Sequence, residues 1–270
     1  MVAVIDTGVN AAELAGAALP GRSFPDLGTD VHDENGHGTR MARVVLAAAP
    51  GAKVLPVKVA GGADVLADAI TWATANGAQV INVSQGAKRR SDRLVAAVRA
   101  AIERGVIVVA AAGNVAQDTR VPAPADLDGV LAISAVDADG RFRPDISVSG
   151  PEVDLAAPGV GIAVSPEDKP ASGTSYAAAI TSGVVALVRA RYPDLTGEEV
   201  VRKLTGTARD AGPPGPDPEY GAGIVDPVAA TAEEPSTVAS WVLSLGVLAV
   251  GAAAASGGLV WWRRRRSQRS

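Results

Sequence analysis

The chain has no cysteine, few aromatic residues and only two histidines among its 270 residues. Without cysteine it can form neither a disulfide framework nor a thiolate metal site. An aromatic content of 3% leaves mainly alanine, glycine and valine to fill the core. Any imidazole chemistry must come from His32 or His37. The formal net charge is -4, and no basic footprint of the kind that binds nucleic acid is present outside one short tail, which argues against nucleic acid as a partner.

The N-terminus lacks the features of a signal peptide. The segment "MVAVIDTGVN" has the pattern of a strand from its first residues, with no basic region and no long apolar run. We therefore expect either insertion by another route or a true start upstream of Met1. If the true start lies upstream, the domain over residues 1–230 is truncated at its N-terminus.

One long uncharged segment, Trp241 to Trp262, is followed directly by Arg263 to Arg266. At about 1.5 Å per residue, roughly 22 helical residues span about 33 Å, enough to cross a hydrocarbon core of about 30 Å. Tryptophans at both ends are typical of membrane interfaces, and basic residues favour the cytoplasmic side. The sequence therefore predicts a polar linker over 231–240, a transmembrane helix over 241–262 and a basic cytoplasmic tail over 263–270. A buried Ala/Gly-rich core helix is the alternative.

Residues 1–230 alternate between apolar and amphipathic segments. Runs rich in Val and Ile predict strands over 2–6, 52–59, 78–84, 105–113 and 130–136. Helical patterns cover 40–49, 64–77, 91–105 and 195–204, and a further helix is expected to open at Ser175 and to end at Pro193. This alternation predicts an α/β domain whose parallel sheet is covered on both faces.

Polar residues stand where these strands end and where two of the helices begin. Asp6, Ser84 and Asn114 end three predicted strands, while His37 and Ser175 each open a helix. In an α/β sheet, chemistry gathers at the carboxyl ends of the strands. The pattern therefore places a carboxylate, an imidazole and a hydroxyl on one edge of the fold.

Such a set suits acyl transfer by an activated serine. The hydroxyl of Ser175 needs a base to take its proton, and His37 suits that role with an ordinary pKa of about 6.5. Asp6 can fix the tautomer of the imidazole, while Asn114 and the backbone N–H of Ser175 can stabilise an oxyanion. Taken singly, each residue has an ordinary explanation as a turn or a helix cap. Their coincidence at one sheet edge favours the catalytic interpretation.

No metal or nucleotide motif is legible. "DENGH" offers oxygen atoms, but Asp33 and Glu34 are expected to be solvated loop residues, and no full calcium ligand set can be read. We therefore predict no cofactor and leave a structural calcium ion open. A nucleotide-binding domain is disfavoured because neither Gly-x-Gly-x-x-Gly nor a Walker-type Gly-Lys-Ser/Thr occurs.

Six ordered motifs resemble those of the subtilisin-like serine proteases: "VAVIDTGV", "NGHGTRMA", "VINVSQG", "VIVVAAAGN", "LAAPG" and "SGTSYAAA". The resemblance covers about residues 1–230 and implies a three-layer α/β sandwich that cleaves polypeptides. It assigns Asp6 as orienting acid, His37 as general base, Ser175 as nucleophile and Asn114 as oxyanion donor.

The same resemblance implies that an extended polypeptide substrate contacts Ser84, Gln85, Gly86 and Gly113, by the addition of a strand. Gln85 stands where the family usually has leucine, which alters the apolar side of the cleft. Arg43 stands where the family usually has a small residue, so its side chain needs room or a partner.

A narrower resemblance is to the mycosins, membrane-anchored subtilases of type VII secretion systems. The C-terminal span and "GTSYAA" carry it, whereas the lack of cysteine departs from the disulfides usual in that group. It implies a single-pass protein of the cell membrane, with an extracytoplasmic serine endopeptidase domain and a secretion complex as partner. The alternative is a catalytically inactive scaffold that stabilises such a complex.

Overall fold

Seven parallel strands form one sheet in the order β2-β3-β1-β4-β5-β6-β7. The computed structural model describes residues 1–26 and 28–233, and the unit Met1–Thr231 contains the whole sheet. The strands are β1 Val2–Asp6, β2 Arg22–Phe24, β3 Val54–Val59, β4 Val80–Val83, β5 Ile107–Ala111, β6 Leu131–Val136 and β7 Leu155–Pro158. All five predicted strands are present.

The two strands that the sequence did not predict lie at the edges of the sheet. Both are short: β2 has three residues and β7 has four. The first carries polar Arg22 and Ser23, and the second ends at Pro158. Edge strands form only one ladder, so they need neither the length nor the continuous apolar pattern that reveals a central strand.

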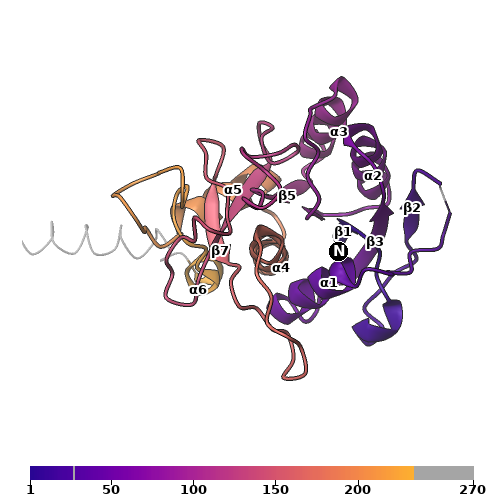
Figure 1. Cartoon of the computed structure of the whole chain (residues 1–270), viewed down its shortest axis with the longest axis horizontal. Coiled ribbons are helices and arrows are strands. Elements are labelled where there is room, and N and C mark those ends of the chain that lie inside the picture. Colours follow the sequence, from indigo (N-terminus) through magenta and orange to yellow (C-terminus); the bar gives the residue numbers. More distant parts are fainter. Residues whose placement is uncertain (27, 234–270) are drawn as a thin grey trace, which may run out of the picture. The chain divides into compact units, whose positions relative to one another are not determined.

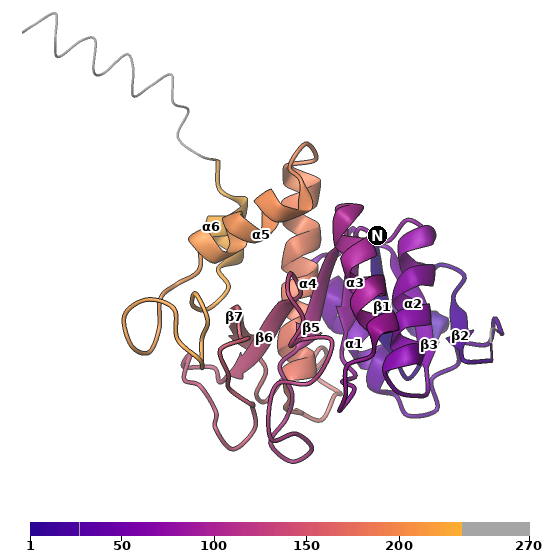
Figure 2. The ribbon, with the colours of Figure 1, turned by 90° about the horizontal axis from the view of Figure 1, so that it is seen from above.

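Helices cover both faces of this sheet, which confirms the three layers (Figure 1). They are α1 His37–Ala48, α2 Ala63–Ala75, α3 Asp92–Glu103, α4 Thr174–Arg191, α5 Gly197–Gly206 and α6 Pro227–Thr231, with a 3-10 turn, η1, at Ala11–Leu14. One core lies under α2 and α3, and the other lies under α1 and α4. Figure 2 shows α5 and α6 on the side of α4, and both contribute to that second core.

Strand β1 shows why the sheet needs both layers. Its five residues are all buried, with Ala3 and Ile5 in the first core and Val2 and Val4 in the second. A strand buried on both faces is apolar throughout, as the sequence pattern predicted.

Helix α4 runs through the second core and is mostly small residues. Gly183 is needed where α4 crosses α1, because a Cβ atom there would lie 2.5 Å from Ala48 Cβ and 2.9 Å from the Val45 carbonyl oxygen. In this chain the close approach of the two helices is made by a glycine on α4. The side chain of Arg43 on α1 instead pairs with Asp168, through hydrogen bonds of 3.1 and 3.0 Å.

None of the helices in the described residues is both long and apolar enough to span a bilayer. The predicted linker over 231–240 begins at Thr231, which is the last residue of α6, and its residues 234–240 lie outside the described residues. The predicted span over 241–262 and tail over 263–270 lie fully outside them. These three segments stay predictions from the sequence.

Candidate active site

Asp6 and His37 are in direct contact at the carboxyl edge of the sheet. Asp6 is the last residue of β1 and is fully buried, and its Oδ1 lies 2.7 Å from Nδ1 of His37. The same oxygen accepts a hydrogen bond from the backbone N–H of Thr7 at 2.7 Å. Since a carboxylate only accepts hydrogen bonds, Nδ1 donates here, and Nε2 is left as the acceptor.

Glycine allows this contact to form. Gly38 is the second residue of α1, and a Cβ atom there would lie 2.2 Å from the Gly8 carbonyl oxygen and 2.9 Å from Asp6 Cβ. Gly8 itself has φ +124°, which non-glycine residues rarely adopt. The two glycines let the start of α1 lie directly on the end of β1.

The pKa of His37 is raised above its ordinary value. Burial lowers this pKa, but the hydrogen bond to Asp6 and the negative charges of Asp6 and Asp33 raise it by more. Arg40 opposes them with a smaller lowering effect. A carboxylate beside an imidazole therefore makes His37 a stronger base than a free histidine.

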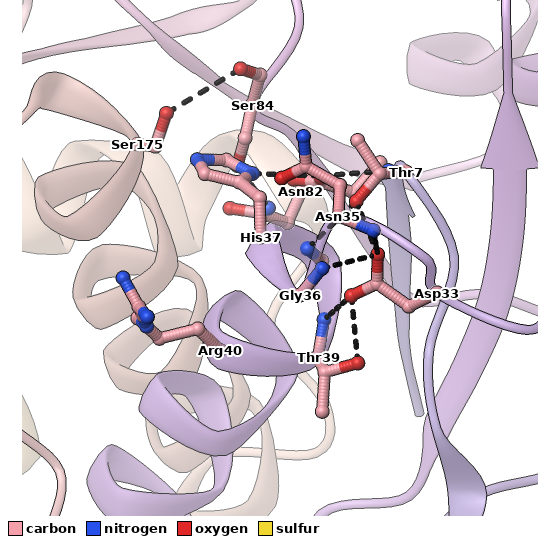
Figure 3. Close-up of polar contacts among 12 residues, drawn as sticks. Thr7, Asp33, Asn35, Gly36, His37, Thr39, Arg40, Asn82, Ser84 and Ser175 are labelled. Carbon is pink, nitrogen blue, oxygen red and sulfur yellow. Dashed lines mark hydrogen bonds and ion pairs between the residues drawn. The ribbon is translucent and has the colours of Figure 1, made fainter. Parts of the chain in front are cut away.

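Asp33 is buried, so the expectation of a solvated loop residue was wrong. It is 4% exposed, and its carboxylate accepts hydrogen bonds from the hydroxyls of Thr7 and Thr39 and from the backbone N–H groups of Asn35, Gly36 and Thr39. Burial raises its pKa, but these hydrogen bonds together lower it below the ordinary value. Figure 3 shows the carboxylate at the centre of this ring of donors.

The sequence carried a signal for this role. The spacing Asp33-x-x-Gly36 is typical of a turn in which an aspartate accepts backbone N–H groups, and Gly36 has φ +81° directly before α1. Glu34, by contrast, is exposed as expected. The loop therefore fixes the helix that carries His37.

Ser175 is the second residue of α4 and is 5% exposed. Gly173 precedes the helix with φ +157°, a conformation that only glycine adopts readily. The Ser175 hydroxyl donates to the Ser84 carbonyl oxygen at 3.4 Å. Figure 3 shows Ser84, Ser175 and the His37 ring close together, with the hydroxyl of Ser175 turned toward Ser84.

Asn114 lies against the same helix terminus. Its Oδ1 accepts from the backbone N–H of Thr174 at 3.0 Å and from the Thr174 hydroxyl at 3.3 Å. Within the described residues its amide Nδ2 has no hydrogen-bond partner, so this donor is available. The backbone N–H groups at the start of α4 add further positive potential beside it.

The four predicted substrate contacts lie on two neighbouring strand ends. Ser84, Gln85 and Gly86 follow β4, and buried Gly113 follows β5 with φ +99°. Next to them, the backbone N–H of Ala87 donates to the Ala123 carbonyl oxygen at 2.7 Å. Their contact with substrate stays a prediction.

The buried side-chain amide of Asn82, which the sequence did not single out, holds the segment that begins at Ser84. Asn82 in β4 is fully buried, and its Nδ2 donates to the Ser84 hydroxyl at 2.8 Å. Its Oδ1 accepts from the Ser182 hydroxyl on α4 at 3.1 Å. The position of an asparagine inside a continuous apolar strand was the available signal, since a buried amide needs partners.

Within residues 1–26 and 28–233, no group of three or more Asp, Glu or His side chains could hold a metal ion. The absence of a cofactor stays a prediction from the sequence, as does the open question of calcium.

Comparison with known proteins gives the family. The model of the subtilase family matches residues 1–223. The thermostable alkaline protease of Halalkalibacterium halodurans is 36% identical over 244 residues, which is 83% of this chain and 65% of that protein. Mycosin-1 of Mycolicibacterium smegmatis is 33% identical over 85% of this chain and 67% of its own length. The chain thus spans about two thirds of the length of these two relatives.

Solved structures support the same family. The crystal structure of MycP1 without its N-terminal propeptide superposes with a TM-score of 0.73 at 32% identity, covering 87% of this chain and 91% of that one. The structure of MycP3 protease gives 0.73 at 33% identity, covering 86% and 82%. The narrower likeness to mycosins is therefore confirmed as well. From the matched motifs, the sheet order and these relatives, the chain belongs to the subtilase family of subtilisin-like serine proteases.

Proposed function

We propose that this chain is a membrane-anchored serine endopeptidase that uses Asp6, His37 and Ser175 to hydrolyse polypeptides. The 2.7 Å contact between Asp6 Oδ1 and His37 Nδ1, beside the hydroxyl of Ser175, carries the proposal. It gives the imidazole a fixed tautomer whose Nε2 can take the proton of a serine.

The reaction then follows in two acyl-transfer steps. Ser175 Oγ attacks the carbonyl carbon of the scissile bond while His37 Nε2 takes its proton, and Asp6 stabilises the resulting imidazolium. The amide of Asn114 and the backbone N–H of Ser175 stabilise the oxyanion of the tetrahedral intermediate. His37 returns the proton to the leaving amine as the C–N bond breaks. Water, activated by the same imidazole, then hydrolyses the acyl-enzyme.

The hydroxyl of Ser175 must turn from Ser84 to His37 for this step, by rotation about its Cα–Cβ bond. Such hydrogen bonds are often long or turned away in a free enzyme and form when substrate binds. The observed contact of Ser175 with Ser84 is compatible with a resting state.

Labelling with a fluorophosphonate tests the nucleophile. The native chain should be labelled covalently, and Ser175→Ala should lose both labelling and peptide cleavage while keeping its circular dichroism spectrum. Ser172→Ala is the matched control, because Ser172 lies before α4 and donates no proton in this scheme. Unchanged labelling of Ser175→Ala would exclude Ser175. No labelling of the folded native chain would favour the inactive scaffold.

The membrane setting is proposed from the sequence and from the relatives. Residues 241–262 would form a single span, with residues 263–270 in the cytoplasm and the catalytic domain on the other side. MycP3 comes from a type VII (ESX-3) secretion system, which supports a secretion complex as partner of this chain. Copurification of such a complex with a tagged full-length chain tests that part of the proposal.

A further inference from the structure

Arg40 brings a positive charge next to the proposed nucleophile. It lies on α1, one turn after His37, and its Nη1 donates to the Tyr176 hydroxyl at 3.0 Å. Tyr176 directly follows Ser175 in α4 and is buried. The hydrogen bond thus fixes the guanidinium of Arg40 beside the first turn of α4.

The charge of Arg40 has no carboxylate partner within the described residues. Its one side-chain partner there is a neutral phenol. Asp168 is near enough to raise the pKa of Arg40, after the larger effects of Tyr176. That carboxylate is already paired with Arg43, by two hydrogen bonds of 3.1 and 3.0 Å.

The carboxylate of Asp168 already accepts several hydrogen bonds, so it is not available to pair with Arg40. Besides Arg43, it accepts from the backbone N–H groups of Val164 and Ser165 at 3.1 and 2.9 Å. Asp168 is thus the partner that the large side chain of Arg43 was expected to need. Among residues 1–26 and 28–233, the half-buried guanidinium of Arg40 has N–H donors that no acceptor uses, and such a group binds a carboxylate readily.

The position of Arg40 indicates which part of a substrate would reach it. In Figure 3, Arg40 lies below Ser175, whereas Ser84 lies above it, on the other side of the His37 ring. If the acyl part of an extended substrate follows Ser84 to Gly86, the chain beyond the scissile bond leaves on the side of Arg40. A carboxylate carried there would meet the free donors of the guanidinium.

We propose that Arg40 is a specificity-determining residue that binds an acidic side chain at the first or second position after the scissile bond. The substrates would then be polypeptides with aspartate or glutamate just beyond the cleaved bond. This inference rests on the proposed peptidase function of the same site.

Matched peptides test it. Sets that carry Glu, Gln or Lys at each of these two positions, and are otherwise identical, are compared by kcat/KM with the full chain. At low ionic strength we expect the native chain to prefer Glu over Gln by about tenfold at one of the two positions, and to disfavour Lys. Raising the salt should reduce this preference, because the site is partly exposed.

Substitutions of Arg40 test whether this residue causes the preference for Glu. Arg40→Gln should remove the preference for Glu, Arg40→Lys should keep part of it, and Arg40→Glu should turn it toward Lys. Arg99→Gln is the control, since Arg99 is exposed on α3 and pairs with Glu103. It should leave the ratio as in the native chain.

The outcomes separate the two proposals. Equal kcat/KM for the Glu and Gln peptides at both positions, in a native chain that is labelled by fluorophosphonate, overturns this inference alone. A Glu preference that survives in Arg40→Gln overturns the assignment to Arg40. No labelling and no cleavage by the folded native chain overturns the proposed function, and this inference with it.

Discussion

The imidazole of His37 contacts the buried carboxylate of Asp6 and lies near Ser175 (Figure 3). Its Nδ1 contacts Asp6 at 2.7 Å, and the Asp6 side chain is fully buried. At this scale, the proposed chemistry depends on two properties of single groups: the pKa of the ring, and the Asn114 amide Nδ2, which has no hydrogen-bond partner among the described residues.

The pH profile should show the effect of Asp6. A general base must be neutral, and the pKa of His37 is raised because the hydrogen bond and charge of Asp6 outweigh its burial. Activity, measured as kcat/KM for a neutral peptide, should therefore rise with pH through a midpoint above the ordinary value of about 6.5. Asp6→Asn should move that midpoint down and reduce kcat by about 10³- to 10⁴-fold. A flat profile between about pH 5 and 8 would argue against His37 as base.

Asn114→Ala should reduce turnover far more than substrate binding. Removing one oxyanion donor costs about 10²- to 10³-fold in kcat, because the donor acts mainly on the transition state. Steady-state kinetics on one peptide separate the two constants. The matched control is Asn76→Ala at the exposed end of α2, which should change neither. A loss confined to KM would contradict the role of Asn114 as oxyanion donor.

At the scale of elements, the loop before α1 is as important as the helix. The N-cap residue of α1 is Gly36, which has no side chain to accept a hydrogen bond from the helix. The carboxylate of Asp33, three residues earlier, caps the helix instead by accepting from the backbone N–H groups of Gly36 and Thr39. The sequence predicted that His37 opens a helix, and the structure confirms it. At the start of α5 the structure shows a capping box, in which the side chains of Thr196 and Glu199 each accept a hydrogen bond from the backbone N–H of the other. Local signals of this kind are reliable because both partners lie within one turn.

Asp33→Ala should destabilise the fold by about 3 kcal/mol, since it leaves several buried donors without an acceptor. Urea unfolding followed by circular dichroism measures the change. Glu34→Ala is the control: its side chain is 84% exposed, so the change should stay within about 0.5 kcal/mol. Equal effects of the two substitutions would contradict the structural role of Asp33.

The pH dependence of this contribution has a definite sign. The folded-state pKa of Asp33 is lowered below its ordinary value by hydrogen bonds that outweigh its burial. Its stabilisation is therefore present above the ordinary carboxyl pKa of about 3.9 and is lost as the pH falls through the lower folded value. The difference in stability between the native chain and Asp33→Ala should shrink in that acidic range.

For the whole molecule, the charges on either side of the apolar segment predict the orientation of the proposed membrane span. Arg263 to Arg266 adjoin one end of residues 241–262, while Glu233 and Glu234 precede the other. Each arginine at a bilayer centre costs about 2.5 to 3.5 kcal/mol on insertion scales, so translocating the tail is disfavoured. We expect residues 263–270 to stay in the cytoplasm.

Protease protection in spheroplasts measures this orientation. A tag after Ser270 should be resistant until detergent is added, while the catalytic domain should be digested from outside. A cytoplasmic marker serves as the control for intact membranes. Digestion of the tag with protection of the catalytic domain would reverse the orientation, and the substrate would then lie in the cytoplasm.

The sequence by itself determined the α/β class, the five central strands, the helix that begins at His37, the helix that begins within one residue of Ser175, and the family. Each of these depends on periodicity, local caps or ordered motifs, which are properties of neighbouring residues. It did not reveal the short edge strands β2 and β7, because a single ladder needs little apolar pattern.

Only the tertiary structure decided which polar groups meet. Asp33 accepts from Thr7, which is 26 residues away, and Arg43 pairs with Asp168 across 125 residues. Arg40 reaches Tyr176 across 136 residues. Such contacts depend on where the loops fold back over the sheet, and no local pattern specifies that. These distant contacts bury Asp33 and leave Arg40 without a carboxylate partner in the part of the chain that the structure describes, and the specificity that we infer rests on them.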